Sequence, residues 1–331
     1  MKLVKTIILS VIMVSMVGFG CSANDNVDQD DTDPVLMPED VFSQDILNQI
    51  YSHYDIGSNE LEITYIGNHS YLFSTMARRV LIDSLTEIGG GYETTSGVIL
   101  DMMARAEFPF NRISLALTTH IHGDHFDRDE AVNFLIANPD ANHLSTIEVD
   151  ESLQTSSSYN QIQTRTTGIF PDLNTRIQTQ ISGITVDVVR VDHHGSSGEG
   201  EHVAFLFTLN GIKILHVGDA CKIPAQWDGL RLARENIDIL IAPFGSDCSN
   251  WTLVSEDQNP FNIINWYIRP KHIIVSHLNF ETTEAEIQTT VNLLQDELPG
   301  IGISYFHPII LKQKIYIKEG NTIRVIDKPV S

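Results

Sequence analysis

Four potential metal ligands lie within six residues of this chain. They follow the apolar run 113–117 directly and are His120, His122, Asp124 and His125. A strand that ends at Leu117 would lead into a loop at a sheet edge, where these side chains can turn inward together. Neutral imidazole nitrogens and carboxylate oxygens suit a borderline divalent ion such as zinc. So many ligands in so short a stretch predict a site for two metal ions.

Three later apolar stretches also end at potential ligands. Residues 188–191 lead to His193 and His194, residues 212–217 lead to Asp219, and residues 272–276 lead to His277. The ordered set, which opens with His-x-His-x-Asp-His, resembles the metallo-β-lactamase superfamily over about residues 60–315. The sequence segments 117–120 and 125–127 resemble those of the ascorbate-phosphate-lactonase-like branch of this superfamily.

The resemblance implies a role for each of these residues. It places His120, His122 and one of His193 and His194 on a first metal, Asp124, His125 and His277 on a second, and Asp219 between them. Asp124 and Asp219 would be the catalytic carboxylates. The implied cofactor is two Zn²⁺ ions, with Mn²⁺ or Fe²⁺ as alternatives, and the implied nucleophile is a hydroxide that the two ions share. Strand alternation from Val189 and Val191 favours His193 as the ligand, and His194 remains the alternative.

Two of four further residues, His216 and Trp251, have two possible roles each. His216 either supports the ligands or packs in the core, whereas we expect His272 to be a core residue only. His69 lies in a Gly-Asn-His-Ser turn that resembles the family's Gly-His-x-Ser turn but is shifted by one residue. Trp251 is either a wall of the substrate pocket or a Trp packed at the surface.

The sequence pattern predicts an αββα sandwich, with two mixed β-sheets, helices on the outer faces and the ligands in loops along one edge. The expected strands are 61–66, 70–73, 79–82, 113–118, 185–191, 203–209, 212–216, 237–241 and 272–275. The expected helices are 96–106, 127–137, 225–235, 262–267 and 283–295. Residues 154–180 are expected to form an inserted hairpin over the site.

The N-terminal residues have the composition of an export signal. Lys2 and Lys5 precede an apolar stretch at about 7–17, and a small residue precedes Cys21. We expect residues 1–20 to be a signal peptide, 21–40 an acidic flexible tether, and 41–331 the hydrolase domain. Residues 18–21 resemble a lipobox, so the protein is expected to be exported and lipid-anchored through Cys21 at the bacterial cell envelope. An ordinary cleaved signal and an uncleaved anchor are the alternatives.

Composition restricts the possible partners. The chain has 331 residues, 42% of them hydrophobic, and a formal net charge of −22. So acidic a protein repels polyanions, which argues against a nucleic-acid substrate and in favour of a small molecule. Cys221 and Cys248 could form one disulfide or remain two thiols.

These observations together predict a metal-dependent hydrolase that acts on a small-molecule lactone or phosphodiester. The alternative is a non-catalytic, metal-binding surface lipoprotein that acts as a sensor or scaffold. Because all seven expected ligand positions are filled, including the bridging Asp219, the catalytic interpretation is favoured.

Overall fold

The computed structural model describes residues 56–86, 97–193, 200–220, 222–244, 251, 259–278, 282–306 and 312–328. The expected signal peptide and tether, with Cys21, lie outside these residues, as do His194, Cys221 and Cys248. Within the described part of the chain, no helix is long and apolar enough to cross a membrane.

The first sheet has eight strands in the order β15-β14-β1-β2-β3-β4-β5-β6. Their bounds are β1 Glu60–Gly67, β2 Ser70–Ser74, β3 Arg79–Ile82, β4 Ile113–Leu117, β5 Asn142–Ser145, β6 Thr166–Gly168, β14 Gln313–Glu319 and β15 Thr322–Asp327. Strands β3 to β6 run parallel, and the remaining pairs are antiparallel. The sheet is therefore mixed, as predicted.

The second sheet has seven strands in the order β13-β12-β11-β10-β9-β8-β7. Their bounds are β7 Arg176–Ile181, β8 Ile184–Arg190, β9 Val203–Leu209, β10 Ile212–His216, β11 Ile239–Pro243, β12 His272–Ser276 and β13 Gly302–Tyr305. Strands β10 to β13 are parallel, whereas β7 to β10 form an antiparallel meander.

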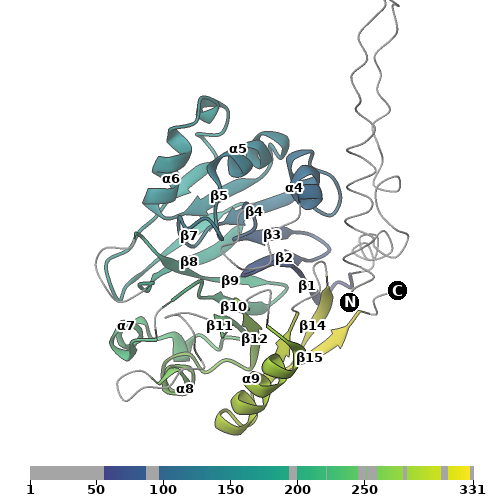
Figure 1. Cartoon of the computed structure of the whole chain (residues 1–331), viewed down its shortest axis with the longest axis vertical. Coiled ribbons are helices and arrows are strands. Elements are labelled where there is room, and N and C mark those ends of the chain that lie inside the picture. The colour runs from purple at the N-terminus through teal and green to yellow at the C-terminus, as the bar shows by residue number, and fades with distance from the viewer. Residues whose placement is uncertain are drawn as a thin grey trace, which may run out of the picture. The chain divides into compact units, whose positions relative to one another are not determined.

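Helices cover the outer faces of both sheets, which gives the predicted αββα sandwich (Figure 1). Helices α4 (Gly97–Ala104), α5 (Arg128–Ala137) and α6 (Ile147–Gln154) lie on the side of the first sheet. Helices α7 (Pro224–Trp227), α8 (Pro260–Asn262) and α9 (Glu284–Glu297) lie on the side of the second. One apolar cluster fills the space between the sheets, and a second joins the second sheet to its helices. Burial of these two layers is the main stabilising contribution to the fold.

Capping residues fix the start of two helices. The Asp127 carboxylate accepts hydrogen bonds from the backbone N–H groups of Asp129 and Glu130 at the start of α5. Thr283 and Glu286 form a capping box at the start of α9. The cap at Asp127 matters for the site, because it fixes the chain two residues after His125.

Two predicted elements were wrong. The expected helix 225–235 ends at Trp227 and continues as two 3₁₀ turns, Asp228–Leu230 and Leu232–Arg234. Arg231 between them has a φ of 56°, which an α-helix does not allow. The expected hairpin at 154–180 is a crossover, since β6 joins the first sheet and β7 joins the second. The sequence analysis also missed β5, α6 and β13 to β15.

Candidate metal centre

The seven predicted ligands come together in two groups at one edge of the sandwich. The first group is His120, His122 and His193, and the second is Asp124, His125, Asp219 and His277. Within each group, one ligand atom from every residue lies within 4.8 Å of the others. The residues follow the C-terminal ends of β4, β8, β10 and β12, so four strands of two sheets position them.

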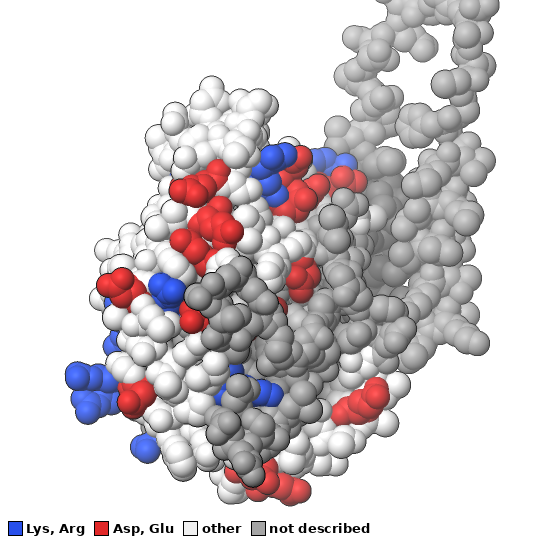
Figure 2. Space-filling model, turned by 60° about the vertical axis from the view of Figure 1, so that its left-hand side comes forward, with Lys and Arg blue, Asp and Glu red and all other residues white. Residues whose placement is uncertain are grey.

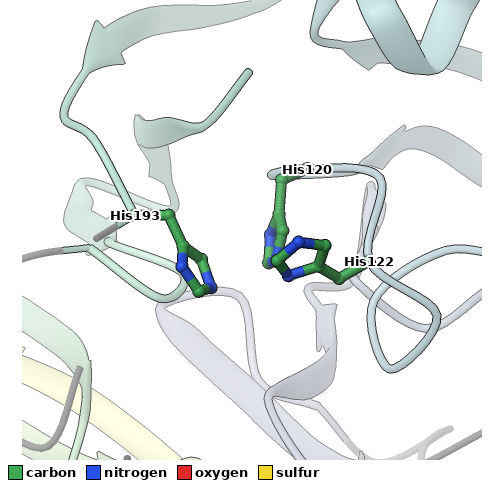
Figure 3. A group of neighbouring side chains, drawn as sticks. All are labelled: His120, His122 and His193. Carbon is green, nitrogen blue, oxygen red and sulfur yellow. The ribbon is translucent and has the colours of Figure 1, made fainter. Parts of the chain in front are cut away.

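The first group consists of three imidazole rings from two loops. His120 and His122 come from the loop after β4 and His193 from the end of β8, and their rings converge in Figure 3. The ring centroids of His193 lie 5.0 Å from His120 and 4.8 Å from His122. Three converging imidazoles form a common donor set for zinc. The preference for His193 agrees with this placement, and His194 lies outside the described residues.

The second group combines two imidazoles with two carboxylates. Asp124 Oδ2 lies 3.4 Å from His125 Nε2 and 3.6 Å from His277 Nε2. His277 has a φ of 56°, an uncommon backbone conformation for a residue other than glycine. Such strained positions concentrate at functional sites, because surrounding structure must hold them in place.

Asp219 lies between the two groups. Its Oδ2 atom is 3.2 Å from His193 Nε2 in the first group and 3.3 Å from His125 Nε2 in the second. Its Oδ1 atom is 3.2 Å from His277 Nε2. A single carboxylate therefore contacts histidines of both groups, which is the position predicted for a bridging ligand.

The charge and hydrogen bonding of these residues fit a cation. His120 Nε2 is buried and has no hydrogen-bond partner among the described residues, so its position favours a metal as partner. Burial lowers the pKa of His277, but Asp219 and hydrogen bonds with both aspartates outweigh this effect and raise it to about 9. The two carboxylates thus strongly favour positive charge at this point, and a bound divalent ion would supply it.

Asp83, which the sequence analysis missed, orients the ligand His125 and also holds Thr119, the residue before His120. Its Oδ2 atom accepts hydrogen bonds from His125 Nδ1, at 3.0 Å, and from Thr119 Oγ1, at 2.8 Å. Its Oδ1 atom accepts one from the Thr119 backbone N–H, next to His120. The bond to Nδ1 leaves the Nε2 lone pair of His125 directed at the second group.

We expect Asp83→Asn to weaken zinc binding about 10- to 100-fold. In either orientation of the Asn side chain, its NH₂ group would face a group that now donates to Asp83, which is His125 Nδ1 in one orientation and the Thr119 backbone N–H in the other. Competition with a chelator measures the affinity. The matched control is Asp187→Asn, which changes a buried carboxylate held by Gln178 and Arg176 on β7, away from the ligands. An unchanged zinc Kd in a folded Asp83→Asn protein would contradict the orienting role.

The turn between β1 and β2 also reaches the second group. Asn68 Nδ2 donates to Asp124 Oδ2, at 3.1 Å, and so holds a predicted ligand. His69 is fully buried, with its ring 5.7 Å from that of His277. In this shifted turn, Asn68 contacts a ligand directly and His69 packs behind the ligands.

Of the other residues discussed above, His216 lies beside the site, whereas His272 and Trp251 lie in the core. His216 is buried and its Nε2 hydrogen bonds with the His69 carbonyl, so it supports the turn that carries Asn68. His272 hydrogen bonds with Ser304 on β13 and is a core residue, as expected. Trp251 is fully buried and donates to the Ala220 carbonyl, so neither the pocket-wall nor the surface-packed interpretation was correct.

The predicted ligands differ in their exposure. His120, His125, Asp219 and His277 are each less than 5% exposed, whereas His122 and Asp124 are half-buried. His122 and Asp124 are therefore the most accessible of the seven predicted ligands.

Several solved structures share the fold of this chain. The chain resembles Igni18, a metallo hydrolase from the archaeon Ignicoccus hospitalis (TM-score 0.53, 14% identity, 78% of this chain and 100% of that chain). It also resembles the metallo-β-lactamase fold protein YhfI from Bacillus subtilis (TM-score 0.50, 13% identity, 75% and 96%). A third structure with this fold is CmlA, a diiron β-hydroxylase from Streptomyces venezuelae (TM-score 0.50, 13% identity, 82% and 55%).

Among curated proteins, none matches this chain. The family described as "Beta-lactamase superfamily domain" matches residues 62–277, which include all seven predicted ligands and most of both sheets. This match covers more than half of the sequence, and the protein belongs to the β-lactamase superfamily.

Proposed function

We propose that this protein is a dinuclear, metal-dependent hydrolase of a small-molecule ester, with a lactone as the favoured substrate class and a phosphodiester as the second. The observation that carries the proposal is the position of Asp219, whose carboxylate lies 3.2 Å from both His193 Nε2 and His277 Nε2. A single metal ion would not need a carboxylate that contacts both histidine groups.

The donor set favours zinc. Five imidazoles and two carboxylates are nitrogen and oxygen donors of intermediate softness, which suit zinc and also accept manganese or iron. Two divalent ions at such a site lower the pKa of water towards neutrality and polarise the bond under attack. The presence of CmlA among proteins of this fold makes iron the main alternative.

The protein residues have separate tasks in this proposal. His120, His122 and His193 would hold one ion, Asp124, His125 and His277 the other, and Asp219 would join both. Asp83 and Asn68 orient His125 and Asp124. In the hydrolysis of a lactone, water adds to the carbonyl carbon, the bond to the ring oxygen breaks, and that oxygen takes up a proton. Burial of the inner ligands excludes bulk water and strengthens electrostatic interactions around the reacting ester.

Charge near the ligands favours a neutral substrate over a phosphodiester. Residues 194–199 follow His193 and residues 279–281 closely follow His277, and neither stretch contains Lys or Arg. Lys222, three residues after Asp219, is 5% exposed. Two arginines lie close to the ligands in sequence, but each is paired with an acidic side chain: Arg128, three residues after His125, with Asp129, and Arg190, three residues before His193, with Asp192. The chain therefore offers little free positive charge to bind a phosphodiester.

The distribution of charged side chains on the surface also argues against larger anions, such as nucleic acids, as substrates. Figure 2 shows acidic and basic side chains interspersed on one face, with no continuous basic stripe among the described residues. Together with the net charge of −22, this distribution supports a small molecule, and not a nucleic acid, as substrate.

A panel of substrates tests the proposed function. Zinc-loaded and manganese-loaded protein should hydrolyse neutral lactones with a kcat/KM well above that for phosphodiesters, and removal of the metal by chelation should abolish both activities. A β-lactam and a thioester complete the panel. Metal-replete protein that binds these compounds in thermal-shift assays without turning any of them over would favour the sensor or scaffold function.

A further inference from the structure

His202 occupies a position from which it could be mistaken for a metal ligand. It immediately precedes β9 and is 2% exposed. Its ring centroid lies 5.1 Å from that of His120 and 5.8 Å from that of His193, two members of the first group. By proximity alone, it would be a fourth histidine for that group.

Both ring nitrogens of His202 are already used by the protein. Nδ1 lies 2.7 Å from the Val191 carbonyl oxygen, which can only accept, so Nδ1 carries the hydrogen. Nε2 accepts a hydrogen bond from the Asp219 backbone N–H, at 3.0 Å. These two bonds require the neutral tautomer protonated at Nδ1, and the Nε2 lone pair is directed at the Asp219 N–H.

We propose that His202 is a positioning residue that joins three of the ligand-bearing loops and does not itself bind a metal. The inference rests on the proposed metal centre. Through its ring, His202 links Val191, two residues before His193, to Asp219. Through its backbone it forms an isolated antiparallel bridge with His120.

The adjacent backbone reinforces the link to the loop after β4. The Val203 N–H donates to the Thr119 carbonyl, at 3.1 Å, next to His120. His202 and Val203 therefore hold the loop of His120 by main-chain contacts. The His202 ring holds the loops of His193 and Asp219. The contacts of His202 thus help to set the distances between His120, His193 and Asp219.

Gly218 shows how tightly this arrangement is packed. Its φ is 53°, and a Cβ atom there would lie 2.7 Å from His202 Nε2 and 2.9 Å from Thr119 Oγ1. A side chain at position 218 would therefore displace the His202 ring from the Asp219 N–H. The absence of a side chain at Gly218 lets the turn before Asp219 approach the His202 ring closely.

The experiment compares two substitutions at His202 with a matched control. His202→Phe keeps a planar ring and removes both hydrogen bonds, whereas the amide oxygen of His202→Gln can still accept from the Asp219 N–H. His272→Phe is the control, because His272 is a buried histidine with one side-chain hydrogen bond, to Ser304, outside the site. Each protein is measured for zinc content, zinc Kd by chelator competition, and the absorption spectrum of its Co²⁺ form.

We expect His202→Phe to bind zinc about 10- to 100-fold more weakly than wild type and to have an altered Co²⁺ spectrum. His202→Gln should recover part of the affinity and keep two metal equivalents, and His272→Phe should match wild type in both measurements. If His202→Gln loses a whole metal equivalent, His202 is a ligand and the proposal is wrong.

Failure of the proposed metal centre and failure of the positioning role of His202 would give different results. Wild-type protein that binds no metal would overturn the proposed metal centre itself. Wild-type protein with two zinc ions, together with His202 variants of unchanged Kd and Co²⁺ spectrum, would overturn only the positioning role. If His202→Phe does not fold, as judged by circular dichroism, the Gln variant decides by the same two measurements.

Discussion

Asp219→Ala is expected to lose at least one of two zinc equivalents and to lower kcat/KM for the best ester about 10³-fold or more. The reason is its position, with one oxygen 3.2 Å from His193 Nε2 and the other 3.2 Å from His277 Nε2. The substitution also removes the carboxylate that does most to raise the pKa of His277. Elemental analysis of protein reconstituted with zinc and steady-state kinetics measure the two effects.

The control for this experiment is Asp187→Ala, since Asp187 is a buried carboxylate on β8 that lies away from the ligands. It should keep both zinc ions and nearly all of the activity. Circular dichroism establishes that both variants are folded. Two zinc equivalents in folded Asp219→Ala would rule out the bridging role, and near-zero zinc in reconstituted wild type would rule out the dinuclear site.

His193→Ala should lower metal occupancy and abolish turnover, whereas His194→Ala should keep both metals and mainly alter the kinetic constants. The basis is the placement of the His193 ring within 5.0 Å, centroid to centroid, of the rings of both His120 and His122. Each variant is the control for the other, because the two substitutions remove the same side chain at neighbouring positions. Metal loss from His194→Ala alone would transfer the ligand role to His194.

The ligands could be predicted because each follows a recognisable strand. The apolar runs before His120, His193, Asp219 and His277 correspond to β4, β8, β10 and β12, with ends within two residues of those expected. The resemblance to the metallo-β-lactamase superfamily then implied that the ends of these strands meet at one edge. The chemical type of each side chain then indicated the site without any knowledge of distances.

The residues that orient the ligands could not be predicted in this way. Asp83 reaches His125 across 42 positions and Asn68 reaches Asp124 across 56, and neither spacing forms a local pattern. His202 resembled any other histidine until its partners Val191 and Asp219 were known. Such contacts depend on tertiary packing, which periodicity in the sequence does not specify.

The wrong elements have a similar cause. At 225–235 the sequence has helix-forming residues, but Gly229 packs against the Asn174 backbone and Arg231 adopts a left-handed conformation. Tertiary contacts therefore override local propensity. Export and the lipid anchor at Cys21 remain predictions. The choice between a disulfide and two thiols at Cys221 and Cys248 also remains open, as does the role of His194.

The pairing of β1 with β14 joins two segments that are far apart in the sequence. Glu60 pairs with Ile317 and Thr64 with Gln313, so a strand made early is completed by one made more than 240 residues later. The same β1 leads into Asn68, which holds Asp124. Pairing over so long a separation is slow, and until it occurs one edge of β1 stays open to other chains. We therefore expect Asn68, and the predicted ligand Asp124 that it holds, to reach their final positions only after residues 313–319 have been synthesised and have docked.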